Sequence, residues 1–393
     1  MSCATLAAGL VAVVFQGESA PVKLAPDTIR MLLTWEVAEG RHPTADSIGE
    51  LSGIAMDAAG NVYASDFSAM KVWVFDAMGR SLPAIGRKGR GPGEFEAPTG
   101  IAVGPDGRLY VRDLVLVTRF ATDPATGRLT RYEDAFRGPA MSDWRSMHAT
   151  RFDASGRIYY PAFNTIGRSK RTGLFYAFSR TGELVDSIVV PAFSGAPAST
   201  ASVRLSANGG RMLRGLNHVP FAPLPTWDIT PRGTLVSAAG PLYEIRETDA
   251  QGRETRVYRR STSPERIPPR IRQDSIASLR ARLDSVPVPL DRVEGMPPEV
   301  RSLRLPETYP PFMSVHAATD GRVWVRRWVA GDRDESVFDV FEPDGRFSHV
   351  VVLPRMIAVA PTPSLAVDKI AAVGVDRETG ANTILRFAMA GRR

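Results

Sequence analysis

The chain has 393 residues, with 49 Lys and Arg against 42 Asp and Glu, and a formal net charge of +7. A hydrophobic content of 44% with 23% charged residues excludes a wholly disordered or collagen-like chain. The 34 glycines and 31 prolines exceed their usual share, which indicates many turns and hence many short strands. Cys3 is the single cysteine, so an intrachain disulfide and a cysteine zinc cluster are excluded.

The first residues indicate export. The apolar stretch from Leu6 to Phe15 has the length of the hydrophobic part of a signal peptide and is too short to span a bilayer. Small residues follow it, as a cleavage site requires, but no Lys or Arg precedes Lys23. We therefore expect residues 1–20 to be an export signal with a truncated start and the protein to be periplasmic or extracellular; a disordered N-terminus is the alternative. No transmembrane segment is expected.

A repeat organises the chain after this segment. Residues 53–66 are echoed by residues 100–113, and each copy has an apolar strand, a turn that ends in glycine and a second apolar strand that ends in Asp. Alignment on the turn glycine recovers weaker copies at 152–160, 229–237, 317–325 and 365–376. Further strands follow each pair. Six units of four strands, at a period of roughly 45 residues, are typical of the blades of a β-propeller.

The two ends of the chain are expected to close the ring. Residues 28–37 alternate apolar and polar side chains before the first unit, whereas the sixth unit lacks a fourth strand. We expect residues 28–37 to pair beside residues 382–389, because closure removes exposed sheet edges. The predicted fold is therefore all-β: a single six-bladed β-propeller over residues 28–389, closed by an N-terminal strand.

Two segments interrupt the repeat. Residues 191–225 carry five prolines and are expected to form a long connection between blades three and four. Residues 263–311 form the larger insertion, between blades four and five. Within it, residues 274–286 place apolar side chains at helical spacing between prolines. We predict one short amphipathic helix there, lying over a face of the ring.

One part of the chain resembles a known family. The segment from Ile85 to Phe95, together with residues 97–103 and 105–111, resembles an NHL-type repeat and is most similar to bacterial six-bladed propellers of that family. The resemblance is specific over residues 53–120 and weaker elsewhere. It implies a six-bladed propeller and export. It assigns no function, because this fold hosts binding proteins, lyases, lactone hydrolases and RNA binders.

Three polar residues occupy one register of the predicted first strands. The position five residues before the turn glycine is Arg151, Asp228 and His316 in units three to five, and His148 lies just upstream. First strands line the channel of a propeller, so these side chains are expected at one level. They form either a mutually satisfied buried ion pair and hydrogen bond, or the floor of a ligand pocket at the channel mouth. These four residues are the candidate ligand-binding site.

Two other features are interpreted as structural. Asp66 and Asp113 end equivalent strands and are expected to accept hydrogen bonds from backbone N–H groups of nearby turns. The loop from Gly86 to Phe95 is glycine-rich and basic, but a phosphate cradle normally leads into a helix, whereas this loop leads into a strand. We interpret it as a connector.

Metal and nucleic-acid sites receive little support from the sequence. The five histidines contain no short-spaced pair that resembles a zinc motif, so no metal or other cofactor is expected; zinc held by several blades, or calcium in the channel with Asp228, are the alternatives. Arginine is concentrated in residues 253–282, which contain one aromatic residue, so nucleic acid is not expected. The candidate basic patch comprises Arg253, Arg256, Arg259, Arg260, Arg266, Arg270 and Arg272.

The function expected from these features is binding. We expect an exported, monomeric propeller that binds a small molecule or a protein and has no chemistry of its own. The first alternative is a lyase or hydrolase that uses the polar residues of the channel. The second is an RNA-binding propeller that uses the arginine-rich region, whose affinity for RNA would fall steeply with salt.

Overall fold

The structure is a computed structural model that describes most of the chain. The described residues are 27–38, 42–44, 47–114, 116–138, 150–164, 172–190, 201–206, 209–213, 219–286, 289, 293–294, 296–329, 334–376 and 379–390. The predicted export signal, residues 1–20, lies outside these ranges. Within them, no helix is both long enough and apolar enough to cross a bilayer.

Four four-stranded antiparallel sheets follow one another along the chain, and the strands of each pair in chain order. The first sheet comprises β2 (Leu51–Met56), β3 (Val62–Asp66), β4 (Lys71–Phe75) and β5 (Ser81–Ile85). The second comprises β6 (Pro98–Val103), β7 (Leu109–Asp113), β8 (Leu116–Ala121) and β9 (Arg131–Arg137). The third comprises β10 (Arg151–Phe152), β11 (Ile158–Asn164), β12 (Thr172–Phe178) and β13 (Leu184–Val189). The fourth comprises β16 (Thr226–Ile229), β17 (Leu235–Ala238), β18 (Glu244–Thr248) and β19 (Glu254–Arg259).

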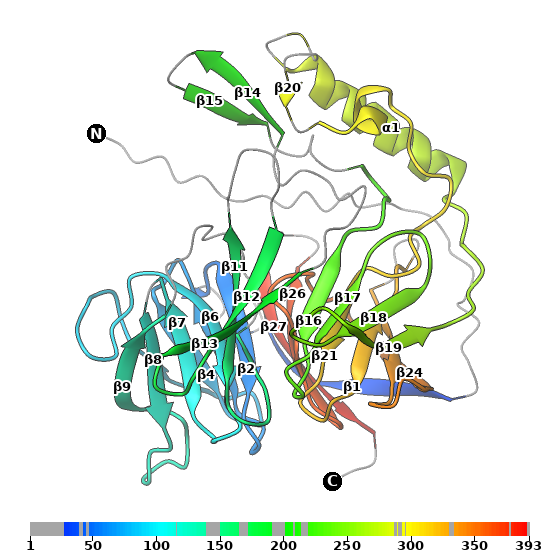
Figure 1. The fold of residues 1–393 in the computed structure, drawn as a ribbon. Coiled ribbons are helices and arrows are strands. Elements are labelled where there is room, and N and C mark those ends of the chain that lie inside the picture. The colour runs from blue at the N-terminus through cyan, green and yellow to red at the C-terminus, as the bar shows by residue number, and fades with distance from the viewer. Residues whose placement is uncertain are drawn as a thin grey trace.

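A fifth sheet has eight strands, in the order β21-β22-β23-β24-β1-β27-β26-β25. Its strands are β21 (Ser314–Ala317), β22 (Val323–Arg326), β23 (Ser336–Phe341), β24 (Phe347–Leu353), β25 (Ser364–Leu365), β26 (Lys369–Val375), β27 (Asn382–Met389) and β1 (Thr28–Val37). The sequence predicted six separate sheets, whereas the structure has four separate blades and this larger sheet. The architecture is all-β and propeller-like (Figure 1).

Strand β1 explains why two predicted blades form one sheet. Its pairing with β27 is confirmed, antiparallel from Met31 opposite Met389 to Val37 opposite Ile384. The strand is longer than this pairing needs, and residues 28–30 continue in parallel along residues 350–352 of β24. The pairing with β24 was not predicted. It joins the four strands β21–β24 to the four strands β25, β26, β27 and β1.

The turn glycines of the first two blades lie at equivalent positions and have the conformation that the repeat predicts. Gly60 and Gly107 have φ angles of +87° and +71°, in the left-handed region that favours glycine. The N–H of each donates to a backbone carbonyl three residues earlier, at 3.0 Å in both turns. This closes a tight turn between the first and second strands of the blade. Equivalent strands therefore begin at equivalent positions in successive blades.

Apolar side chains from neighbouring sheets make the core. Tyr63 and Val74 of the first sheet pack in one cluster with Leu109 and Phe120 of the second, and all four are almost fully buried. Between the fourth and fifth sheets, the rings of Tyr258 and Phe341 lie 5.8 Å apart. Burial of one such large side chain contributes about 1.5–3 kcal/mol, so contacts between blades are a main source of stability.

The insertion between β19 and β21 contains more structure than predicted. Helix α1 spans Pro269–Asp284 and begins five residues earlier than expected, because proline is tolerated in the first turn of a helix. A second helix, α2 (Pro298–Arg301), was not predicted. The predicted apolar face is present: Leu279 and Leu283 are buried in a cluster that also contains Phe221 and Tyr309.

The segment before the fourth blade also differs from the prediction. Residues 191–225 were expected to form a long connection between blades three and four, and within it the structure has two strands that were not predicted, β14 (Ala201–Ser206) and β15 (Gly209–Leu213). These strands form a three-stranded sheet with β20 (Val293–Glu294) of the later insertion. The sheet and α1 lie on the same side of the blades, at the top of the view in Figure 1.

Candidate functional site

Two of the predicted channel residues form an ion pair between the third and fourth blades. Arg151 of β10 binds Asp228 of β16 with two hydrogen bonds, from Nε at 2.6 Å and from Nη2 at 2.8 Å. The Asp228 carboxylate also accepts the backbone N–H groups of Ile229 and Ala317, each at 2.9 Å. The aspartate is 6% exposed and has four donors, which is about the capacity of a carboxylate. These contacts fit a mutually satisfied ion pair that connects the third and fourth blades with the fifth sheet.

His316 lies in the same region but makes a different contact. Its Nε2 atom is 2.8 Å from the hydroxyl of Ser314, and the side chain is 5% exposed. Burial lowers the pKa of His316, Asp228 opposes this effect and Arg151 and Arg326 add to it, so that the pKa falls to about 3. The imidazole is therefore neutral at physiological pH. His148, the fourth predicted residue, lies outside the described residues, so a ligand role for this group stays a prediction.

The two features interpreted as structural have the expected contacts. Asp66 accepts the backbone N–H of Gly49 at 2.7 Å and of Ala69 at 2.8 Å, and Asp113 accepts that of Glu96 at 2.8 Å. In the glycine-rich loop, the arginines pair with glutamates of the loop or just after it, Arg87 with Glu94 and Arg90 with Glu96. The loop ends at Phe95, which is fully buried between the first two blades.

The candidate basic patch is divided among several environments. Four of its arginines lie on or beside β19 and pair with carboxylates: Arg253 with Asp249, Arg256 with Glu247, Arg259 with Glu244 and Arg260 with Asp339. The other three belong to the insertion. Arg272 donates hydrogen bonds to the carbonyls of Leu305 and Pro306, the backbone of Arg266 forms a β-bridge with Thr308, and Arg270 is exposed on α1. Most of this positive charge is therefore balanced locally.

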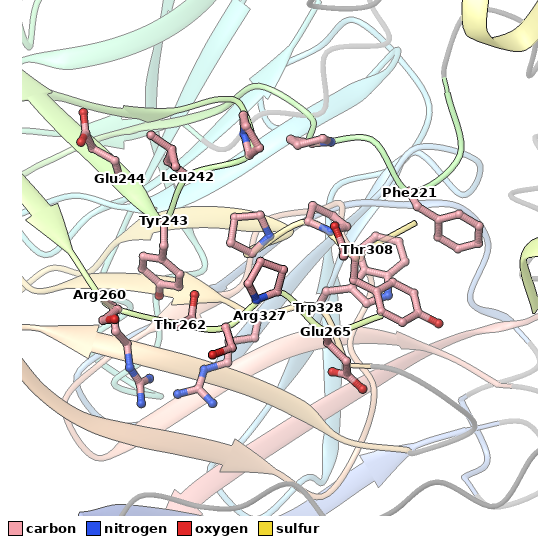
Figure 2. Close-up of a pocket in the computed structure, with 18 of the residues that line it drawn as sticks. Phe221, Leu242, Tyr243, Glu244, Arg260, Thr262, Glu265, Thr308, Arg327 and Trp328 are labelled. Carbon is pink, nitrogen blue, oxygen red and sulfur yellow. The ribbon is translucent and has the colours of Figure 1, made fainter. Parts of the chain in front are cut away.

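A cavity that the sequence did not predict lies between the fourth blade, the eight-stranded fifth sheet and the insertion (Figure 2). Its volume is about 960 Å³. Its walls come from four segments, namely residues 241–244, 259–265, 306–311 without Glu307, and 327–329, and from Phe221, Pro223 and Val337. No group of three or more His, Cys, Asp or Glu side chains placed to hold a metal occurs in the described part of the chain.

The polar side chains of this cavity share one buried carboxylate as their hydrogen-bond acceptor. Asp339 lies within β23 and is fully buried, and it accepts the hydroxyl of Tyr243 at 2.7 Å. Arg327 donates to it through Nε, at 2.8 and 2.9 Å, and through Nη2, and Arg260 donates through Nη1. Burial raises the pKa of Asp339, and the hydrogen bonds from Arg327 and Tyr243 oppose that rise. Burial also raises the pKa of Tyr243 well above its ordinary value, so its hydroxyl stays a donor.

The opposite side of the cavity is aromatic. Tyr309 and Trp328 are stacked, with ring centroids 5.6 Å apart and planes inclined at 22°. The ring of Phe221 meets both edge-on, at 5.6 Å from Tyr309 and 6.1 Å from Trp328. Leu242 lines the rim and is 69% exposed. Figure 2 shows Arg260 and Arg327 toward one end of the cavity and Trp328 and Phe221 toward the other.

The sequence contained one signal of this site. Asp339 interrupts the otherwise apolar run of residues 337–341, and a charged residue within a buried strand requires partners. Those partners lie far from it along the chain, so pattern reasoning could not identify them. Arg260 was assigned instead to the basic patch.

Comparisons with known proteins give weak likenesses. No protein-family model and no curated protein matches the chain. Among solved structures, virginiamycin B lyase from Staphylococcus aureus is 11% identical, with a TM-score of 0.41 over 90% of this chain and 98% of that one. An aldose sugar dehydrogenase from Streptomyces coelicolor is 13% identical, with a TM-score of 0.43 over 91% and 97%. A candidate exported protein from Bacteroides fragilis is 10% identical, with a TM-score of 0.46 over 92% and 99%. Likenesses of this strength assign neither a family nor an activity to this chain.

Proposed function

We propose that the protein is an exported, monomeric, six-bladed β-propeller of the NHL type that binds a small molecule in the cavity between its fourth and fifth blades and has no chemistry of its own. The count of six is supported by the eight-stranded sheet, which divides at β1 into two antiparallel units of four strands. The units are joined by the parallel pairing of residues 28–30 with residues 350–352 and by the hydrogen bond from the N–H of Val350 to the carbonyl of Asp27. With the four separate sheets they make six blades.

The observation that carries the binding function is the construction of the cavity. Its volume of about 960 Å³ lies within the range of small-molecule sites. Fixed polar groups around Asp339 occupy one side, and aromatic and proline rings occupy the others. Leu242 at the rim is an exposed apolar group that a bound molecule would cover. An apolar cavity with a few convergent polar groups is the usual form of a ligand site.

The contacts elsewhere support binding over the alternatives. The Asp228 carboxylate is saturated by protein donors, and His316 is neutral and bonded to Ser314. A histidine that stays neutral down to about pH 3 is not poised as a general acid or base near neutral pH. The arginines of β19 are paired with carboxylates, which weakens them as phosphate contacts. The lyase or hydrolase and the RNA-binding propeller therefore stay predictions without a contact that favours them.

A thermal-shift screen of a small-molecule library tests this proposal. Leu242→Trp should place an indole in the mouth of the cavity, whereas Leu184→Trp changes a leucine of β13 that is 59% exposed and does not line the cavity. We expect at least one compound to raise the Tm of the wild type and of Leu184→Trp, but not that of Leu242→Trp. The proposal is wrong if no compound stabilises the wild type, or if stabilising compounds act equally on Leu242→Trp.

A further inference from the structure

We infer that the ligand of this cavity is an organic oxyanion, in which a carboxylate or phosphate group is attached to a flat, apolar body. Arg260 and Arg327 would bind the charged group, and Trp328 would contact the body. This inference rests on the proposed function and adds the chemical class of the ligand.

The buried carboxylate cannot serve the ligand itself. Asp339 has no exposed surface and already accepts from Tyr243, Arg260 and Arg327. A carboxylate offers about four acceptor positions, and these donors occupy them. A cationic or hydrogen-bond-donating ligand would therefore find no acceptor in this group.

The two arginines, in contrast, have donors to spare. A guanidinium has five N–H groups, and within the described residues only Nη1 of Arg260 and Nε and Nη2 of Arg327 have side-chain partners. Their side chains are 21% and 19% exposed, and both line the cavity. Two positive charges face one negative charge, so the group has an excess of positive charge and of donors. Planar or tetrahedral oxyanions are the partners that guanidinium groups match best.

These donors are held in place before any ligand arrives. The guanidinium of Arg260 lies over the ring of Phe347, 4.4 Å from its centroid, in addition to its contact with Asp339. Arg327 is held by bonds from two of its nitrogens to one carboxylate. Fixed donors lose little side-chain entropy on binding, which favours affinity for a small ion.

The acidic residues of the cavity do not reverse this charge. Glu244 is shared by Arg246 and Arg259, with the Arg259 contact at 2.9 Å. Glu265 lies on the exposed rim, where solvent screens its charge. The arginine side of the cavity is thus its cationic side.

The aromatic wall of the cavity indicates the shape and polarity of the uncharged part of the ligand. Trp328 directly follows Arg327 in the chain, and both line the cavity. It is only partly buried and is stacked on Tyr309, so its ring is a flat apolar surface toward the other end of the cavity from the two guanidinium groups. A ligand that uses both features carries its anionic group at one end and a flat or apolar body at the other.

Calorimetric titration of the full chain with matched probes tests this class. Phenylacetate and phenylacetamide share one body and differ in charge, and phenyl phosphate replaces the carboxylate by a phosphate. We expect the better of the two acids to bind at least about tenfold more tightly than phenylacetamide, and Arg260→Gln to remove that difference. The acid that binds more tightly identifies the group, carboxylate or phosphate. Arg253→Gln, at an exposed arginine that pairs with Asp249 outside the cavity, should leave affinity unchanged.

Three results would overturn the assignment. They are equal affinity for phenylacetate, phenyl phosphate and phenylacetamide, acid binding that survives Arg260→Gln, and no acid binding at about 10 mM, a concentration at which even very weak sites are detected. Circular dichroism would verify that Arg260→Gln is folded; if it is not, the affinity ratio between acid and amide in the wild type decides. A neutral library compound whose effect is lost in Leu242→Trp would sink the oxyanion class while leaving the proposed function intact.

Discussion

Burial of His316 makes the stability of the protein depend on pH. The folded-state pKa of His316 is about 3, against 6.5 for an exposed histidine. Between these values the unfolded chain binds a proton that the folded protein does not, so the free energy of unfolding rises with pH across this window. At about pH 5 the unfolded state is stabilised by this protonation by about 2 kcal/mol, and at about pH 7.5 by almost nothing. The contribution of His316 is thus fully present above pH 6.5 and is lost as the pH falls.

The comparison with His316→Gln isolates this contribution. Glutamine does not titrate and can still bond to the hydroxyl of Ser314, the partner of His316. Urea denaturation of both proteins at several pH values, followed by circular dichroism, gives two curves of unfolding free energy against pH. All other groups contribute equally to both curves, so the wild type should lose about 2 kcal/mol more than the variant between pH 7.5 and 5. Parallel curves, or a steeper curve for the variant, would refute the neutral, buried histidine.

Three further predictions concern stability, each measured by urea denaturation. Asp339→Ala should lower the free energy of unfolding by about 3–5 kcal/mol, because it leaves two arginines facing each other without their carboxylate. Asp249→Ala removes the partner of the exposed Arg253 and should have no measurable effect. Similar losses of stability in the two variants would contradict the Asp339 network. Asp228→Ala should cost a similar amount, about 3–5 kcal/mol, yet leave ligand affinity unchanged, whereas a selective loss of affinity would restore the channel as the site. Met31→Ala should cost about 2–5 kcal/mol, because Met31 is 3% exposed in β1, which pairs with β27. Leu32→Ala changes a residue of the same strand that is 55% exposed and should stay within about 0.5 kcal/mol; equal effects would argue against the register of β1.

The sequence by itself determined the features that depend on short-range physics. Turn glycines need positive φ angles, so Gly60 and Gly107 set the start of the second strand in their blades. The period-two alternation of residues 28–37 identified a half-buried strand, and the incomplete last unit identified its partner. The same local reasoning identified the apolar face of α1, with Leu279 and Leu283.

Only tertiary structure decided which strands pair with one another over long distances in the chain. The parallel pairing of residues 28–30 with β24 depends on the length by which β1 extends past β27, and no local pattern encodes that length. The pairing of β14 with β20 likewise joins residues about 90 positions apart. Backbone hydrogen bonds are chemically the same at every position, so a strand edge alone does not identify its partner.

The candidate site also separates what the sequence determined from what only tertiary structure decided. Asp339 was recognisable as a charge that needed partners, but Tyr243, Arg260 and Arg327 come from three different segments. The strength of each contact depends on burial and on the distance between charges, and both arise only when the fourth blade and the fifth sheet pack together. The arginines of β19 appeared as one basic patch in the sequence because a linear count of charge omits the carboxylates that folding places opposite them.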